Sequence, residues 1–182
     1  MYEVELKVRS PHRAVRERLE SLDAERLGAV TQEDTYYDAP HRDFAETDEA
    51  LRVRRETPED GESKAYLTYK GPLVDKTSKT REEAETRVGD ASTAARILDG
   101  LGFEAAATVR KDRERYALDG YTVTLDTVDD LGEFVEVETE VDDGLDTARE
   151  GAFAVLDRLG LDREDGIRTS YLGLLLAGDV SE

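Results

Sequence analysis

The stretch Glu3-Val4-Glu5-Leu6-Lys7-Val8-Arg9 indicates the fold class, because charged and aliphatic residues alternate along it without interruption. Successive side chains of a β-strand point to opposite faces, so a period of two predicts a strand with one charged face and one apolar face. The charged face carries both signs, since Glu3 and Glu5 stand beside Lys7 and Arg9.

The same pattern returns along the chain. Each later stretch sets Arg, Lys or Glu at i, i+2 spacing opposite aliphatic residues. The charged sets are Arg52/Arg54, Lys111/Arg113/Arg115 and Glu136/Glu138/Glu140, and Lys70, Arg81, Glu83, Glu85 and Asp126 fall in further strand-like runs. The matching apolar sets are Leu51/Val53, Val123/Leu125 and Val135/Val137.

Helical spacing separates these strands. Ser10-Pro11 is typical of an N-cap and a first helical residue, and the apolar spacing that follows predicts a helix ending near Gly28. Asp119-Gly120 predicts a hairpin turn. Strands are predicted at 2–9, 29–37, 50–56, 65–70, 81–88, 106–117, 121–128 and 133–141, helices at 92–100, 147–159 and 170–177, and a polar connection at 40–48. We expect one domain over 1–182 without a linker.

The charged faces allow two interpretations. In one, an antiparallel sheet turns its charged side to water and packs its apolar side on the helices. In the other, the strands close into a barrel whose charged faces point inward. Solvated strand faces usually include Thr, Ser, Gln and Asn, whereas these are dense in Arg and Glu. We therefore predict an α+β fold, a closed eight-stranded antiparallel β-barrel jacketed by a few helices.

A lumen of both signs suits a phosphate ligand and its metal. Arg and Lys neutralise phosphate oxygens, and Arg does so with two parallel hydrogen bonds. Paired carboxylates two residues apart can hold Mg²⁺, which favours a few carboxylates together with substrate phosphates. Six or seven basic groups exceed what one phosphate needs and fit a triphosphate chain.

Composition excludes several other classes. The chain has 44 acidic and 25 basic residues, a formal net charge of -19 and no cysteine. Such a charge repels nucleic acid and anionic membranes, so we expect neither as a partner. Disulfides are excluded, and no stretch approaches the roughly 18 to 20 apolar residues of a membrane span. Because the sequence opens on Met1-Tyr2-Glu3, we expect no signal peptide and a cytoplasmic location.

The acidic, lysine-poor composition also suggests a halophilic source, where screening by salt offsets self-repulsion. Loss of the fold in dilute buffer would support this hypothesis, and full stability there would count against it.

The ordered motifs resemble the CYTH superfamily, the triphosphate tunnel enzymes that include class IV adenylyl cyclases and thiamine triphosphatases. The resemblance covers nearly the whole chain. It begins with Glu3-Val4-Glu5-Leu6-Lys7, the Glu-x-Glu-x-Lys signature. It continues through Asp34-Thr35-Tyr36-Tyr37-Asp38, Ala50-Leu51-Arg52-Val53-Arg54, Leu67-Thr68-Tyr69-Lys70-Gly71-Pro72, Arg81-Glu82-Glu83-Ala84-Glu85, Lys111-Asp112-Arg113, Leu125-Asp126 and Leu131-Gly132-Glu133-Phe134-Val135-Glu136-Val137-Glu138.

This resemblance implies an eight-stranded tunnel and a role for each matching residue. Catalytic assistance falls to Lys7 and Tyr36, although Tyr36 is equally explained as an aromatic of the barrel wall. The implied triphosphate-binding residues are Lys7, Arg52, Arg54, Lys70, Arg81, Lys111 and Arg113. The implied ligands of Mg²⁺ (or Mn²⁺) are Glu3, Glu5, Glu136 and Glu138, and Asp126 holds a second metal or a basic neighbour.

The scaffold leaves the reaction open. A cyclase would convert ATP to cyclic AMP and pyrophosphate, whereas a triphosphatase would hydrolyse tripolyphosphate, thiamine triphosphate or a nucleotide. Vertebrate-type thiamine triphosphatases carry a Trp where this chain has Ala50, which disfavours thiamine. Chain length and the region around Tyr37 favour the class IV cyclase-like branch. A non-catalytic nucleotide or polyphosphate binder is a third hypothesis, and the oligomeric state, including a homodimer, is left open.

Overall fold

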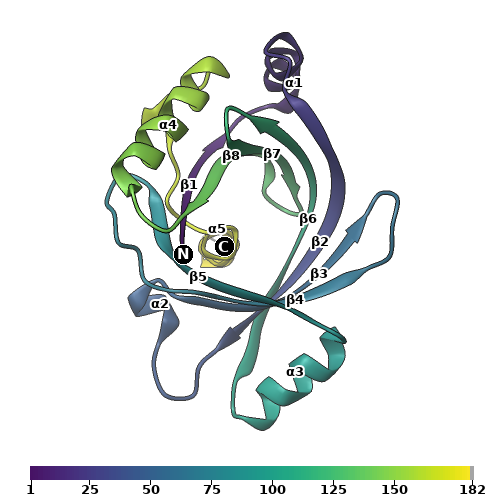
Figure 1. The fold of residues 1–182 in the computed structure, drawn as a ribbon. Helices are drawn as coiled ribbons and strands as arrows, with labels where there is room; N and C mark the ends of the chain where they lie inside the picture. The colour runs from purple at the N-terminus through teal and green to yellow at the C-terminus, as the bar shows by residue number, and fades with distance from the viewer. Residues whose placement is uncertain (181–182) are drawn as a thin grey trace.

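The structure is a computed structural model that describes residues 1–180. Within them the strands form one closed antiparallel barrel in the order β1-β5-β4-β3-β2-β6-β7-β8 (Figure 1). The predicted α+β class and closed eight-stranded barrel are confirmed. The strands are β1 (Tyr2–Arg9), β2 (Glu25–Asp38), β3 (Ala50–Pro58), β4 (Lys64–Lys70), β5 (Lys79–Val88), β6 (Glu104–Leu118), β7 (Tyr121–Val128) and β8 (Gly132–Val141).

Helices cover the outside of this barrel and one of its ends (Figure 1). They are α1 (His12–Ser21), α2 (Phe44–Thr47), α3 (Ala91–Gly100), α4 (Leu145–Arg158) and α5 (Tyr171–Val180), with a 3₁₀ turn η1 (Arg163–Asp165). Among the described residues, no helix combines the length and the apolar character that crossing a membrane requires.

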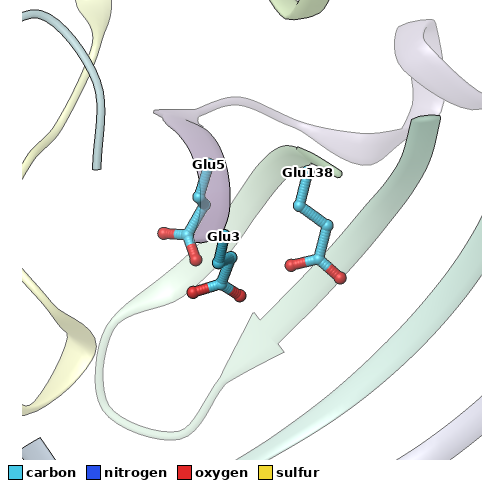
Figure 2. A group of neighbouring side chains, drawn as sticks. All are labelled: Glu3, Glu5 and Glu138. Atoms are coloured by element: carbon cyan, nitrogen blue, oxygen red, sulfur yellow. The ribbon is translucent and has the colours of Figure 1, made fainter. Parts of the chain in front are cut away.

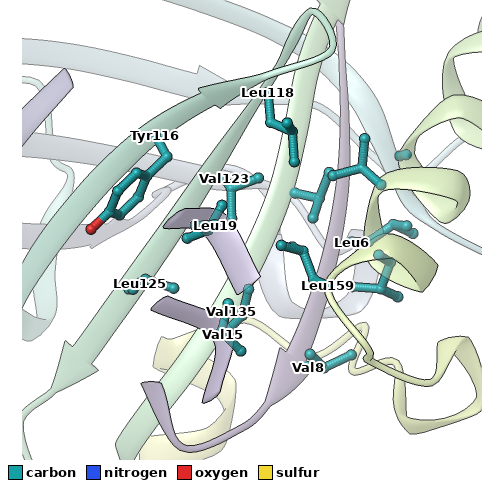
Figure 3. Packing of buried hydrophobic residues seen from close by; sticks show 14 of the residues in the cluster. Leu6, Val8, Val15, Leu19, Tyr116, Leu118, Val123, Leu125, Val135 and Leu159 are labelled. Carbon is teal, nitrogen blue, oxygen red and sulfur yellow. The ribbon is translucent and has the colours of Figure 1, made fainter. Parts of the chain in front are cut away.

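The hydrophobic core lies between the barrel and its helices, not inside the barrel. Leu19 from α1 is almost fully buried in one cluster with Leu6 of β1 and Val135 of β8 (Figure 3). Leu156 from α4 belongs to the same cluster and is also almost fully buried. A fully buried leucine contributes roughly 1.5 to 3 kcal/mol. Since alternate residues of a strand face opposite ways, this packing turns the charged faces inward. A smaller apolar cluster under α3 does the same for β3 and β4.

A tight turn joins β6 to β7. Asp119 and Gly120 have φ angles of 53° and 82°, and the residues on either side, Leu118 and Tyr121, pair directly. Positive φ at both central residues is the conformation that the two-residue hairpin requires. The hairpin predicted from Asp119-Gly120 is confirmed.

Two sequence predictions about the first helix need correction. The first helix ends at Ser21, not near Gly28, because β2 begins at Glu25. Gly28 adopts φ 123° within β2, where the ladder to β6 shifts register. Ser10 makes no side-chain cap, since Pro11 holds the cap position.

The connection at 40–48 also contains an unpredicted turn of helix, α2. Asp43 accepts a hydrogen bond from the Ala45 amide and caps it, while Phe44 is buried.

Candidate active site

The barrel encloses a cavity of about 300 Å³ that is lined mostly by charged side chains. The inward-facing side chains of the strands, some of which line this cavity, lie at successive levels along the barrel axis. Barrel strands are inclined to the axis, so residues at one level are displaced along neighbouring strands. We name three levels. The apolar end holds Lys7, Tyr36, Val109, Val128 and Phe134; the ion-pair levels hold Glu3, Glu5, Asp34, Arg52, Arg54, Lys70, Arg81, Lys111, Arg113, Asp126, Glu136 and Glu138; the mouth holds Glu56, Tyr66, Glu85, Arg115 and Glu140.

Exposure distinguishes the two ends. Phe134 and Val109 at the apolar end are 0% and 1% exposed, whereas Glu85 and Glu140 at the mouth are exposed. Helix α5 packs on the apolar end, and its Tyr171 lines the cavity. In Figure 1, α5 is seen end-on within the outline of the barrel strands. The lumen therefore has a solvent-exposed mouth and a buried, aromatic far end.

Asp34 is the centre of the first ion-pair group. It is fully buried and accepts two hydrogen bonds from Arg54, with Arg52 at 4.0 Å and Lys111 at 3.8 Å. Burial opposes ionisation, yet the three cations hold the pKa of Asp34 far below its usual range. The group carries two positive charges more than the single carboxylate neutralises.

A second group joins β6, β7 and β8. Arg113 donates two hydrogen bonds to Asp126, at 2.7 and 2.6 Å, and a third to Glu136 at 2.8 Å. Lys7 lies 3.5 Å from Glu136. Although burial works against both charges, these contacts raise the pKa of Arg113 and lower that of Glu136 well beyond their ordinary values.

The remaining cations lie where β1, β4 and β5 meet. Lys70 bridges Glu3 and Glu83, and Lys79 lies 3.6 Å from Glu5. Arg81 donates to the Asp48 carbonyl at 2.8 Å.

Two buried lysines titrate near neutrality. Burial, together with Arg113 and Arg54, lowers the pKa of Lys111 to about 7. Burial and Lys7 lower the pKa of Lys79 to about 8, despite the opposing effect of Glu5. Crowded, desolvated cations of this kind are stabilised when an anion enters.

One donor in the ion-pair levels is left unused. Arg52 is 8% exposed, and its Nε has no hydrogen-bond partner among the described residues. Burial alone would lower the pKa of Arg52, but Asp34 and the Tyr36 hydroxyl raise it, so the guanidinium stays charged. An anion in the lumen could accept a hydrogen bond from this donor.

Three carboxylates face the cations across the lumen. Glu3 and Glu5 from β1 and Glu138 from β8 each offer an oxygen, and these oxygens lie within 4.8 Å of one another (Figure 2). Burial raises the pKa of Glu138 to about 8, and repulsion from Glu3, Glu136 and Glu5 adds to it, although Arg113 opposes the shift. The Glu5 Oε1 atom is buried without a hydrogen-bond partner among the described residues. Clustered oxygen donors in need of positive charge fit a divalent cation.

The structure brings the predicted residues together in different ways. Every predicted cation and carboxylate, with the exception of Asp126, lines the cavity. Glu3, Glu5 and Glu138 form the carboxylate group, whereas Asp126 and Glu136 pair with Arg113. Tyr36 lies at the apolar end, where it belongs to the apolar cluster of Val109 and Phe134 and also lines the cavity.

Three residues escaped prediction. Asp34 was noted only as part of a motif. Lys79 lies two residues before Arg81 on the same strand face, so extending the predicted strand 81–88 by two residues toward the N-terminus would have included it. Tyr171 lies in a helix far along the chain from its partner Asp126, and no local pattern links the two.

At the mouth, acceptors outnumber donors. Glu56 accepts hydrogen bonds from Gln32 and Arg115, and Glu85 accepts one from Thr68. One level deeper, the Gln32 Oε1 and Thr124 Oγ1 atoms are buried and have no hydrogen-bond partner among residues 1–180. The carboxylates of Glu56, Glu85 and Glu140 line the cavity beside the ring of Tyr66 and can accept hydrogen bonds from O–H and N–H donors of a ligand.

Comparison with known proteins gives the family. The CYTH domain model matches residues 1–171. The chain belongs to the CYTH family. A protein of Methanocaldococcus jannaschii named "Putative adenylate cyclase" is 38% identical over 177 residues, which cover 96% of this chain and 98% of that protein.

Solved structures of CYTH-like fold agree. A Pyrococcus horikoshii OT3 protein is 40% identical and superposes with a TM-score of 0.89 over 97% of this chain and 99% of that one. A Hippeastrum protein, whose structure is described as "Putative adenylyl cyclase" with "a dominant" triphosphatase activity, is 19% identical with a TM-score of 0.68 over 97% and 95% of the two chains. At that identity the likeness establishes the fold alone.

Proposed function

We propose that this CYTH protein is a divalent-metal-dependent enzyme that converts ATP to cyclic AMP and pyrophosphate. The observation that carries the proposal is a single lumen in which the cations clustered around Asp34 share space with the Glu3, Glu5 and Glu138 carboxylates. Clustered cations suit a polyanionic chain, and the carboxylates suit the metal that accompanies it.

The cations would hold the phosphate chain. Arg52 and Arg54 present guanidinium groups from adjacent positions of one strand face, and Lys111 faces them from β6. Lys70, Arg81 and Arg113 supply further positive charge around the same cavity. Preorganised cations favour the developing charge of a leaving pyrophosphate more than they would in water, because they are already desolvated.

Glu3, Glu5 and Glu138 would hold Mg²⁺ or Mn²⁺, with Glu136 and Asp126 as further predicted ligands. When bound, the metal supplies positive charge to phosphate oxygens and orients the chain. Glu138 must lose its proton for this role, and the nearby Arg113 favours the ionised form.

The mouth would hold the nucleoside. Its acceptors, the carboxylates of Glu56, Glu85 and Glu140, suit ribose hydroxyls and a base amine, which inorganic tripolyphosphate lacks. In the reaction, the ribose 3′-oxygen bonds to the α-phosphorus, the bond to the bridging oxygen breaks, and pyrophosphate leaves. The proton of the 3′-hydroxyl has carboxylate acceptors at this level. The name of the M. jannaschii relative supports the same reaction.

A triphosphatase is the second candidate, and one observation favours it. Lys7 and Tyr36, the residues with predicted catalytic roles, lie toward the apolar end, where Lys7 contacts both the Tyr171 ring and Glu136 of the ion-pair levels. A triphosphate that enters tail first would bring its terminal phosphorus to them, and the α-phosphorus would stay nearer the mouth. Hydrolysis at the terminal phosphorus would then release orthophosphate.

Product analysis separates these reactions. The wild-type protein is incubated at high salt with ATP, and separately with tripolyphosphate, with Mg²⁺ or Mn²⁺. Cyclic AMP with pyrophosphate supports the cyclase, and orthophosphate from either substrate supports the triphosphatase and contradicts the cyclase.

A carboxylate variant separates an enzyme from a binder. Glu138→Gln should lose turnover far more than affinity for ATP, whereas Glu133→Gln, on the same strand but outside the lumen, should behave as wild type. Tight binding without wild-type turnover would favour a non-catalytic binder and overturn the proposal.

A further inference from the structure

The chain that follows η1 completes the barrel wall beside Lys7. β1 pairs with β5 only from Tyr2 to Glu5, because Glu5 lies opposite Lys79, the first residue of β5. No residue of β5 therefore lies opposite Lys7. There Gly166 bridges Val8, and the Ile167 amide donates to the Lys7 carbonyl at 2.7 Å. The C-terminal segment, residues 166–171, therefore takes the place of a strand neighbour and fixes the backbone that carries Lys7.

The same segment also fixes the Lys7 side chain. Lys7 Nζ donates to the Thr169 carbonyl at 3.4 Å and lies 3.8 Å from the centroid of the Tyr171 ring. Lys7 is 2% exposed, so the ring replaces water on one side of the ammonium group. A lysine side chain is otherwise flexible, and a cation held on an aromatic face has one preferred direction.

Tyr171 is held at both ends. Its hydroxyl donates to Asp126 Oδ2 at 2.8 Å, and its ring meets Phe134 edge-on with centroids 5.0 Å apart. Lys111 Nζ lies 5.0 Å from the same ring. One side chain thus links Lys7 of β1, Lys111 of β6 and Asp126 of β7.

We propose that Tyr171 is a positioning residue, whose ring directs Lys7 toward the phosphate and whose hydroxyl orients Asp126, the partner of Arg113. It acts through these groups and not on the reacting atoms. This positioning role extends the proposed function. Testing it by kcat rests on the proposed function, whereas testing it by tripolyphosphate binding does not.

Two substitutions divide the role. Tyr171→Phe keeps the ring and removes the bond to Asp126, and Tyr171→Leu removes both. We expect a small loss of kcat with Phe and a loss of roughly 3- to 30-fold with Leu, the range of a desolvated cation–π contact. KM should change less than kcat, because the other cations remain. Tyr121→Phe, which loses a hydroxyl contact to Ala148 outside the lumen, is the matched control and should match wild type.

A double-mutant cycle with Lys7→Met tests the link directly. In the Lys7→Met background, Tyr171→Leu should lower kcat no more than Tyr171→Phe does, because the ring acts through Lys7 and only the hydroxyl contact to Asp126 is left to lose. Independent, multiplying losses would overturn the proposal, as would full wild-type kcat in Tyr171→Leu.

The same cycle is read in tripolyphosphate affinity by calorimetry without turnover, at temperatures where each variant is folded. Coupling in affinity supports the positioning role even if no turnover of any triphosphate is found, a result that would defeat the proposed function alone. Additive losses in affinity would count against the positioning role.

Discussion

Arg54 donates two hydrogen bonds to the carboxylate of Asp34, from Nε at 2.6 Å and from Nη2 at 2.8 Å. Asp34 is completely buried. The pair has adjacent cations in Arg52 and Lys111. It keeps one guanidinium fixed while leaving a net positive charge beside it. Such an arrangement prepares an anion site before the anion arrives.

Replacing Asp34 by Asn should destabilise the protein. Three buried cations would lose their shared counter-charge, and breaking a buried pair in this way costs about 3 to 5 kcal/mol. Urea unfolding measures the loss, and tripolyphosphate should restore part of it by supplying negative charge. Glu33→Gln, on the exposed face of the same strand, is the control. A loss for Asp34→Asn no greater than that control would contradict this account.

Glu138 should make the metal-free protein sensitive to pH. Its pKa is raised from the ordinary value of 4.5 to about 8 in the folded state. Between pH 4.5 and pH 8, this group therefore holds its proton more in the folded protein than in the unfolded protein. Stability from this group is therefore present at low pH and is lost as pH rises through that window. In EDTA, Glu138→Gln should gain stability relative to wild type from pH 5 to pH 8.

Adding a divalent metal should favour wild type over Glu138→Gln in stability, the opposite of the result expected in EDTA. Mg²⁺ or Mn²⁺ at pH 8 should raise the melting temperature of wild type, because binding to the folded state alone stabilises it. The same metal should raise the melting temperature of Glu138→Gln by less. Equal shifts in both proteins would place the metal elsewhere.

Lys111 should make anion affinity fall with rising pH. Its pKa of about 7 means that the free protein loses this positive charge just above neutrality, and an entering triphosphate favours the protonated form. Without divalent metal, tripolyphosphate affinity should decrease between pH 7 and 9, by up to about 10-fold per pH unit for one linked proton. Lys111→Arg keeps its charge, so its affinity should depend less on pH. This comparison cancels ionisation of the ligand, and parallel pH profiles would rule the linkage out.

Gly151 should be intolerant of a side chain. A Cβ there would lie 2.0 Å from the Tyr121 hydroxyl and 2.8 Å from Cζ of the same ring. Since α4 packs on the barrel at this point, Gly151→Ala should lower the free energy of unfolding by about 1 to 3 kcal/mol. Tyr121→Phe should rescue it only in part, because the ring carbon stays. Gly100→Ala, which meets nothing within 4 Å, should be neutral or stabilising.

Much of this architecture could be read from local pattern. Alternation in Glu3-Val4-Glu5-Leu6-Lys7 predicts strand β1, and Asp119-Gly120 predicts the turn between β6 and β7. Both predictions succeed because each signal depends only on neighbours in sequence. Where local signals compete, prediction failed. Gly28 resembles a helix end but serves a register shift within β2.

The sequence alone determined which faces of the strands are charged and which are apolar, and so the list of groups available to bind phosphate and metal. It could not determine which face points inward, because a period of two is identical for an open sheet and a closed barrel. Tertiary structure decided this by closing β1 against β8 and β5. It also decided that Arg113 pairs with Asp126, and that Tyr171 reaches Lys7 from the far end of the chain. Such contacts depend on barrel tilt and register, which are set by all the strands together and are written in no single stretch.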